Sequence, residues 1–459
     1  MSNTAVKNKK PFGFYVCSLA FTFERMAYYS AKFLIFAFVA ATIIEGGLGL
    51  TKIEAAALQA NLVAFTYLAP IVGGYISDNY IGARYCVPVG LILMAGGYFF
   101  GSTATSAAGI NIMIVLVSIG TGLFKGNVSA ISGYLFDNEK QLDSAFSLQY
   151  SFVNVGSFIG TTVVGYLVTS TFVHGSVQGF RPAFQLCAAF CVVDAIWFLL
   201  GMKHLGDIGK RPFKAGKHVE GEVSTIENKP LNTSEKKRIF AIILISLFSV
   251  VFWVFWYLTY LAVYDYAESF IQLQYGNFEV PLLWFDSLNA FVCIAMGPIL
   301  GALWFKLSKR PQGDLSLFKK LALGLSFLAF AFLTLVGAEI SRGVGADPSS
   351  KASIIWIIAF GILLTIGEML FSPLGNSFVT KYAPAKMFAL LMGVWTFASF
   401  LAGRSYAWIY AITSKMPIMK AYTVIPAILF VCAVLLFVFD KKLMKLLEED
   451  DKKKVKQTA

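Results

Sequence analysis

The stretch Ala421-Tyr-Thr-Val-Ile-Pro-Ala-Ile-Leu-Phe-Val-Cys-Ala-Val-Leu-Leu-Phe-Val-Phe-Asp440 decides the class of fold. Its side chains are almost all apolar on every face of a helix, whereas a surface helix of a soluble protein also has a polar face. About twenty residues of helix is also the length that crosses the hydrocarbon core of a bilayer. Because backbone groups in lipid must form their hydrogen bonds within the segment, this run predicts a transmembrane helix.

Similar apolar segments recur along the whole chain, which is 57% hydrophobic and only 14% charged. A membrane β-barrel would instead alternate apolar and polar residues over segments of about ten residues, and no such alternation is visible. We therefore predict an all-α membrane protein with about twelve transmembrane helices. The spans lie near residues 14–41, 55–77, 85–104, 110–136, 144–170, 182–202, 237–262, 281–307, 316–339, 353–380, 386–412 and 421–440.

The net charge of +12 is unevenly placed between these spans. With the N-terminus in the cytoplasm, about 28 of the 38 Lys and Arg residues fall on cytoplasmic segments, about 6 on external segments and about 4 within the membrane. This bias predicts that the N- and C-termini are both cytoplasmic. The basic segments 203–217 and 452–456 are expected to mark topology and to contact anionic membrane lipids, so nucleic acid is not an expected partner.

Cysteine and histidine show no arrangement typical of a metal site, a disulfide framework or a catalytic centre. The six cysteines lie in or near spans, as small apolar packing residues do. The three histidines, His174, His204 and His218, lie in unrelated loops. We therefore expect no metal, no cofactor and no enzymatic activity. No cleavable signal peptide is expected, because the first span is too long and contains Glu24 and Arg25.

One long polar segment, 203–236, divides the chain and is rich in Lys, Glu, Gly and Pro. It is predicted to be a cytoplasmic linker without a core of its own. It would separate an N-terminal six-helix bundle, 1–202, from a C-terminal six-helix bundle, 237–440, and a charged cytoplasmic tail would follow at 441–459. Two such halves resemble the major facilitator plan, in which the solute site lies between the halves at mid-membrane.

The loop after the second span, Gly74-Tyr-Ile-Ser-Asp78-Asn-Tyr-Ile-Gly82-Ala-Arg84, resembles the cytoplasmic signature between the second and third helices of that superfamily. This resemblance implies a gating role. Asp78 would pair with a neighbouring helix end and Arg84 with a carboxylate, and together they would hold one conformation. The alternative interpretation is an ordinary Gly/Asp turn.

Charged residues within the spans are candidate site residues, because a charge inside a bilayer is costly and rare. The first span contains Glu24, Arg25 and Lys32, which fall on one helical face. The fourth span contains Lys125 and the tenth contains Glu368. Two acids and three bases would leave a net positive cavity that suits an anionic or zwitterionic solute. The alternative is that Glu24, Arg25 and Lys125 only neutralise one another as a structural cluster.

Seven matches, in order along residues 11–440, resemble motifs of the proton-dependent oligopeptide transporter family. The first, Glu24-Arg25-Met-Ala-Tyr28-Tyr29, is similar to the ExxERFxYY stretch of that family. The others are Tyr67, Lys125, Phe146-Ser-Leu-Gln-Tyr150-Ser-Phe-Val-Asn154-Val-Gly156-Ser157, Asn289 with Pro298, Glu368-Met-Leu-Phe-Ser372-Pro373, and Trp395. The chain is thereby identified as an atypical member.

The resemblance implies a role for each matching residue. Arg25 and Lys125 would take the carboxylate of a peptide, and the planar fork of a guanidinium suits that group. Glu368 would face the peptide amine. The remaining substrate-binding residues would be Tyr28, Tyr29, Lys32, Tyr67, Asn154, Asn289, Ser372 and Trp395.

The chain departs from the family pattern at three places. Phe21 replaces the first acid of ExxER, Lys32 stands where arginine is usual, and Tyr257-Leu258 stands where the family tends to show an acid-glutamine pair. Two carboxylates associated with proton handling and gating are therefore missing. Glu24 and Glu368 remain as the expected proton-coupling residues.

The resemblance implies a secondary active transporter of the cell inner membrane that works as a monomer. It would import di- and tripeptides or peptide-like solutes together with protons by alternating access. The alternative is a carrier of another organic anion or zwitterion, or a facilitator in which proton coupling is weak or lost. A receptor that binds without transporting is also compatible with the same fold.

Overall fold

The computed structural model describes residues 10–136, 139–212, 231–311, 315–384 and 387–448. The chain divides into two compact units, residues 1–221 and 222–459. Part of the predicted linker (213–230) and most of the predicted tail (449–459) lie outside the described residues.

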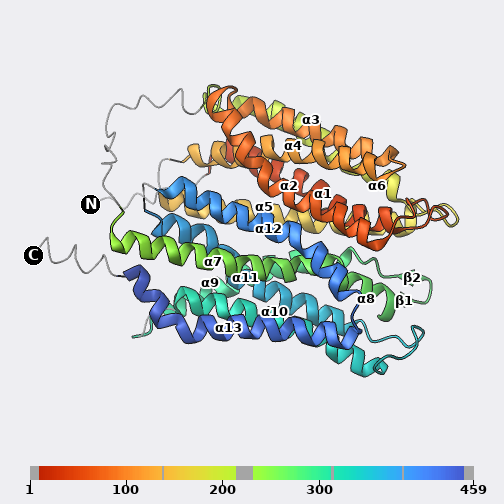
Figure 1. Ribbon diagram of the computed structural model, residues 1–459. Helices are drawn as coiled ribbons and strands as arrows, with labels where there is room; N and C mark the ends of the chain where they lie inside the picture. Colours follow the sequence, from red (N-terminus) through yellow and green to blue (C-terminus); the bar gives the residue numbers. More distant parts are fainter. Residues whose placement is uncertain (1–9, 137–138, 213–230, 312–314, 385–386, 449–459) are drawn as a thin grey trace, which may run out of the picture. The chain divides into compact units, whose positions relative to one another are not determined.

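Unit 1 contains six long helices within its described residues (Figure 1). The helix α4 packs against α2 and α3, α6 packs against α3 and α1, and α1 also packs against α5. A π-helical turn, Leu167–Thr171, extends α5, and a short 3-10 helix, Met202–Leu205, follows α6. The six are α1 (Phe12–Ala40), α2 (Lys52–Asn79), α3 (Ala83–Thr103), α4 (Ala107–Tyr134), α5 (Glu139–Tyr166) and α6 (Phe180–Gly201).

Unit 2 also contains six long helices in the part of the chain that the structure describes. The helix α10 packs against α13 and α11, α12 packs against α7, and α11 packs against α9. A 3-10 turn, Leu258–Tyr260, joins α7 to the short helix α8. The elements are α7 (Thr233–Tyr257), α8 (Ala262–Phe270), the antiparallel strands β1 (Gln274–Tyr275) and β2 (Phe278–Glu279), α9 (Trp284–Ser308), α10 (Leu317–Arg342), α11 (Ile355–Tyr382), α12 (Phe388–Thr413) and α13 (Ile418–Glu448).

Glycines set the close approach of helices in unit 1. A Cβ atom on Gly73 of α2 would lie 2.0 Å from the carbonyl oxygen of Gly122 on α4. A Cβ atom on Gly90 of α3 would lie 2.6 Å from the carbonyl oxygen of Gly120, also on α4. Small residues at helix interfaces let backbones touch, and van der Waals packing then supplies the association that the hydrophobic effect does not supply in lipid.

The predicted all-α membrane fold is confirmed. Ten helices are long and apolar enough to cross a membrane among the described residues. The helix α1 is not among these ten. Its 29 residues are long enough to cross a membrane, but it carries the charged residues Glu24, Arg25 and Lys32. The structure also adds two features that the hydropathy pattern did not predict, namely the α7–α8 break at 258–260 and the β1–β2 hairpin. All six cysteines are free thiols.

Candidate functional site

Glu24 and Arg25 form a two-point ion pair on α1. Arg25 Nε donates to Glu24 Oε2 at 2.5 Å, and Arg25 Nη2 donates to Glu24 Oε1 at 2.6 Å. Both side chains are buried. Two parallel charge-assisted hydrogen bonds hold the guanidinium plane in a defined orientation. In this conformation the two charges neutralise each other.

Tyrosine rings surround the cations of α1. The Arg25 guanidinium carbon lies 4.5 Å from the ring centroid of Tyr28 and 5.7 Å from that of Tyr29. Lys32 Nζ lies 4.7 Å from the Tyr29 centroid. The face of an aromatic ring attracts a cation, and the attraction grows when both groups leave water. The Tyr28 hydroxyl is within hydrogen-bond distance of Thr66 Oγ1 on α2, at 3.2 Å, which orients the ring.

Lys125 reaches the same region from α4. Its Nζ lies 4.9 Å from the ring centroid of Tyr67 on α2, and it is close enough to Arg25 and Glu24 to interact with both electrostatically. Among these residues, Arg25, Lys32 and Lys125 carry three positive charges and Glu24 carries one negative charge, which leaves this group with an excess of positive charge. We call these four residues and their three tyrosines the cationic cluster.

The predicted site residue Asn154 forms its hydrogen bond within its own helix, α5. Its Nδ2 donates to the carbonyl oxygen of Tyr150 on the same helix, at 3.0 Å. The side chain is buried. The amide is therefore used within α5, and a solute would have to compete with that hydrogen bond.

In unit 2 an asparagine amide holds the predicted carboxylate. Asn289 Nδ2 on α9 donates to Glu368 Oε2 on α11 at 2.8 Å and to Thr365 Oγ1 at 2.9 Å. Thr365 Oγ1 in turn donates to the Gly361 carbonyl at 2.7 Å. Two sequence-predicted residues from different helices are thus brought together. The other two predicted substrate-binding residues of unit 2, Ser372 on α11 and Trp395 on α12, are half-buried.

A pocket in unit 2 adjoins this pair, and sequence reasoning missed it. Asn289 forms part of its wall, together with Asp286 one helical turn earlier on α9. The signal was present as the aromatic run of 252–266 and as a carboxylate inside the predicted eighth span. The lining residues are Trp256, Thr259, Tyr260, Val263, Tyr264, Phe285, Asp286, Asn289, Ile357, Phe360, Gly361 and Leu364.

The sequence predicted a carboxylate partner for Arg84; in the structure its hydrogen bonds go to backbone carbonyls, and it also interacts electrostatically with the Asp207 carboxylate. Arg84 Nη2 donates to the carbonyl oxygens of Met202 and Gly206, at 3.1 and 3.0 Å, and the Arg84 amide donates to the Gly209 carbonyl. The reason is topological, because the end of α6 leaves unsatisfied carbonyls beside the start of α3. Leu205 is buried in the core of unit 1, so the first residues of the predicted linker are folded onto this unit. No partner of Asp78 is found in the part of the chain that the structure describes.

A sequence profile described as the POT family matches residues 87–212 and 210–425. The chain belongs to the POT family. Among curated relatives, it is 26% identical over 436 residues to the Peptide transporter YePEPT of Yersinia enterocolitica, covering 82% of this chain and 83% of the relative. It is also 26% identical over 454 residues to the Uncharacterized transporter YclF of Bacillus subtilis, covering 89% of each chain.

A solved structure agrees in fold. The crystal structure of a mutant peptide transporter in complex with alafosfalin superposes with a TM-score of 0.84 at 23% identity, over 95% of this chain and 96% of that chain. The predicted major facilitator fold of two six-helix bundles is thereby confirmed. These relatives are transporters. As a member of the POT family, a family of peptide transporters, this chain is a multi-pass transporter of the inner membrane.

One buried acid of this POT family member was not singled out from the sequence. Asp194 on α6 is fully buried, and neither of its carboxylate oxygens has a hydrogen-bond partner among the described residues. It interacts electrostatically with Glu24. An intramembrane carboxylate was the available signal, and Asp194 lies inside the predicted span 182–202.

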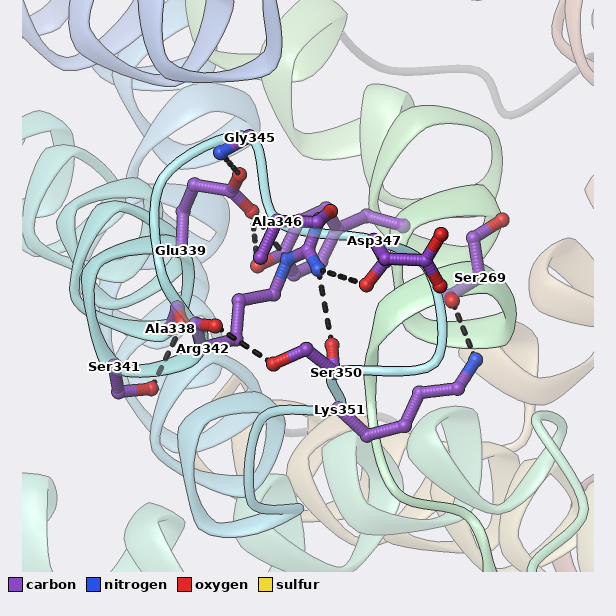
Figure 2. A network of polar contacts seen from close by, with 11 residues as sticks. Ser269, Ala338, Glu339, Ser341, Arg342, Gly345, Ala346, Asp347, Ser350 and Lys351 are labelled. Carbon is purple, nitrogen blue, oxygen red and sulfur yellow. Dashed lines mark hydrogen bonds and ion pairs between the residues drawn. The ribbon is translucent and has the colours of Figure 1, made fainter.

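A third feature that sequence reasoning missed is a network around Arg342 at the end of α10 (Figure 2). Arg342 Nε donates to Glu339 Oε2 at 2.8 Å, and Glu339 Oε1 accepts from the Gly345 amide at 3.1 Å. The other Arg342 nitrogens donate to the carbonyls of Ala346, Asp347 and Ser350. The loop that follows α10 is therefore folded around the Arg342 guanidinium and held by its hydrogen bonds.

The same loop is joined to the end of α8. The Ala352 amide donates to the Phe270 carbonyl at 2.8 Å, and the Arg342 guanidinium carbon lies 4.1 Å from the Phe270 ring centroid. Within the loop, the backbone amide of Ser349 donates to Asp347 and lowers the pKa of that carboxyl. These contacts make the α10–α11 connection part of the folded unit.

Proposed function

We propose that this POT family member imports di- and tripeptides or peptide-like solutes together with protons by alternating access. The observation that carries the proposal is the division of charge between the units. Unit 1 contains the cationic cluster, with its excess of positive charge, and unit 2 contains a carboxylate, Glu368, held by an amide. A zwitterionic peptide offers the complement of both, a carboxylate and an ammonium group.

The carboxylate end of the solute is assigned to Arg25 and Lys125. A carboxylate that enters the cationic cluster can take the place of the Glu24 carboxylate on the Arg25 fork, where two parallel hydrogen bonds are possible. The Tyr28 and Tyr29 rings, with centroids 4.5 and 5.7 Å from the guanidinium carbon, attract the cation without accepting its N–H groups as a carboxylate does. Lys125 supplies a second, point-like charge.

Proton coupling follows from competition for Arg25. When a proton binds a Glu24 carboxylate oxygen, the ion pair with Arg25 is lost and the guanidinium becomes available to the solute. Two unit charges about 4 Å apart interact by about 4 kcal/mol at an effective dielectric constant of about 20, so the exchange of one anion for another involves comparable energies. Protonation of Glu24 and binding of the solute carboxylate therefore favour each other.

The amine end is assigned to Glu368. The Asn289 amide donates to one carboxylate oxygen and so orients the group, and an ammonium would add further charge-assisted hydrogen bonds. We assign the lining of the solute cavity to four further residues, Tyr29 and Tyr67 of the cationic cluster and Ser372 and Trp395 in unit 2.

Gating is assigned to the region of Asp78 and Arg84. Arg84 ties the start of α3 to the carbonyls that follow α6, so a change at this joint would alter two helices of unit 1 together. We assign the basic segments and both termini to the cytoplasmic side, where anionic lipids are their partners, and a monomer as the working form.

A facilitator with weak proton coupling is the second candidate, and one observation favours it. Phe21 packs edge-on against Phe124, with centroids 5.5 Å apart, and Tyr257 lies among Trp253, Trp256 and Tyr406. The positions where the family shows acids are therefore occupied by packed aromatic rings. Two carboxylates that the family pattern would offer for proton binding are therefore replaced by the packed side chains of Phe21 and Tyr257.

Proteoliposomes that contain the purified protein distinguish the candidates. A panel of dipeptides is offered with and without an inward proton gradient, while internal solute and internal pH are both recorded. We expect accumulation only with the gradient, together with solute-linked acidification. Uptake that only equilibrates, without proton movement, would establish the facilitator, and binding without uptake would contradict transport altogether.

A further inference from the structure

The pocket that adjoins Asn289 is walled by aromatic rings. Trp256, Tyr260, Tyr264 and Phe285 follow one another in ring contact, with successive centroids 5.4, 5.8 and 6.3 Å apart. Phe360 completes the wall from α11. All five side chains are buried within unit 2. Such rings present electron-rich faces that attract a cation away from water.

Asp286 supplies the carboxylate of this pocket. The Tyr264 hydroxyl donates a hydrogen bond to it, which orients the acid against the aromatic wall. Asp286 is 5% exposed, and no Lys or Arg is among the residues that line the pocket as the structure describes it. Thr259 Oγ1, also in the lining, has no hydrogen-bond partner among the described residues. The pocket thus combines an acid, an open hydroxyl and aromatic faces.

Asn289 connects the pocket to Glu368. Asp286 and Asn289 are three residues apart on α9, so their side chains share a helix face. Asn289 lines the pocket and also binds Glu368. A solute whose α-amine meets Glu368 would therefore direct its adjoining side chain toward Asp286.

We propose that Asp286 and its aromatic wall form a subsite for a cationic side chain, namely a primary ammonium or a guanidinium group. This inference rests on the proposed function and adds a substrate class to it, peptides that contain a lysine-like or arginine-like residue. An anionic side chain is disfavoured by the carboxylate. A neutral alkyl chain of equal length gains the apolar contact but not the charge–charge and cation–π attraction.

The test compares two side chains that share the same four-carbon chain. Lysyl-alanine and norleucyl-alanine differ by the terminal ammonium, and both compete against labelled alanyl-alanine for uptake into proteoliposomes. We expect wild-type protein to prefer the lysyl peptide by about tenfold or more. Asp286→Asn should reduce that ratio to about one, while Asp286→Glu should restore a preference and guards against a folding defect.

The matched control is Asp265→Asn. Asp265 lies on the neighbouring helix α8, outside the pocket lining, where it accepts from the Tyr410 hydroxyl at 3.3 Å. This variant should keep the wild-type ratio. A wild-type ratio near one, or an unchanged ratio in Asp286→Asn, would overturn the inference.

Binding in detergent separates this inference from the proposed function. The rise in Tm on addition of lysyl-alanine is measured for full-length wild type and Asp286→Asn. If no peptide is transported but lysyl-alanine stabilises only the wild type, the proposed function fails and the subsite stands. If alanyl-alanine is transported and neither assay shows a preference for the ammonium, the subsite fails and the proposed function stands.

Discussion

At the scale of single residues, one guanidinium has two possible partners. Arg25 is held by Glu24 through hydrogen bonds of 2.5 and 2.6 Å, and the rings of Tyr28 and Tyr29 lie 4.5 and 5.7 Å from its guanidinium carbon. A buried pair contributes little net stability, but breaking it by removing one partner leaves an uncompensated charge. Such a pair therefore suits a role in exchange, in which a proton and a solute anion replace its two halves together.

Glu24→Gln tests this exchange directly. Because glutamine carries no ionisable proton, we expect counterflow of solute to continue, while accumulation driven by a proton gradient falls to simple equilibration. Both are measured in the same vesicles. Glu45→Gln is the control, since Glu45 lies in an exposed loop. Gradient-driven concentration of solute by Glu24→Gln would show that another group carries the proton.

Lys125→Ala should abolish accumulation while the protein remains in the membrane. The Lys125 ammonium lies over the Tyr67 ring, and no acid lies within hydrogen-bond distance of it among the described residues. Removing this charge therefore removes attraction for the solute carboxylate. Uptake and membrane abundance are measured together. Lys210→Ala, at an exposed ion pair with Asp207, should have no effect. Near wild-type uptake by Lys125→Ala would contradict the assigned role.

Glu368→Gln should weaken binding of amino-terminated ligands by about tenfold or more, because hydrogen bonds to charged groups contribute about 1.5–3 kcal/mol. Competition by N-acylated analogues, which lack the ammonium, should change much less. Glu279→Gln in the exposed β2 strand serves as the control. Equal losses for both ligand classes would make Glu368 a proton site or a gate.

At the scale of elements, the contact of α2 with α4 depends on the absence of side chains. Gly73 and Gly122 meet backbone to backbone, whereas the next residue, Gly74, has open space where a Cβ would point. The apolar composition of a helix places it in the membrane, but these close approaches decide which helices pack together.

Gly73→Val should lower the Tm of the purified protein, with a destabilisation of about 1–3 kcal/mol as is typical of overpacking. Gly74→Val is the matched control, since it adds the same side chain one residue along the same helix without a neighbour within 4 Å. Thermal unfolding in detergent compares the two variants. Similar losses in both would show that β-branching, not the helix contact, is responsible.

At the scale of the whole molecule, the distribution of basic residues predicts a topology, and the loop after α10 offers a place to test it. Val344 is exposed in that loop, whereas five of the six native cysteines are buried. Val344→Cys should react with a membrane-impermeant maleimide added to intact cells. Lys210→Cys should react only after the cells are opened, and the reverse pattern would invert the assigned orientation.

The sequence by itself determined the membrane class, the positions of the long helices and the family motifs. These depend on local composition, because about twenty apolar residues must become a helix in lipid whatever their neighbours are. Glu24, Arg25, Lys32 and Lys125 could also be singled out, since a charge within an apolar run is visible without a structure.

Only the tertiary structure decided what these residues and others touch. The carbonyl partners of Arg84, the loop around Arg342 and the wall that faces Asp286 are formed by segments far apart in the chain. The pattern of one segment contains no information about which backbone will lie beside it. Carbonyl groups in particular are the same at every residue, so their use as ligands is set by packing geometry rather than by side-chain identity.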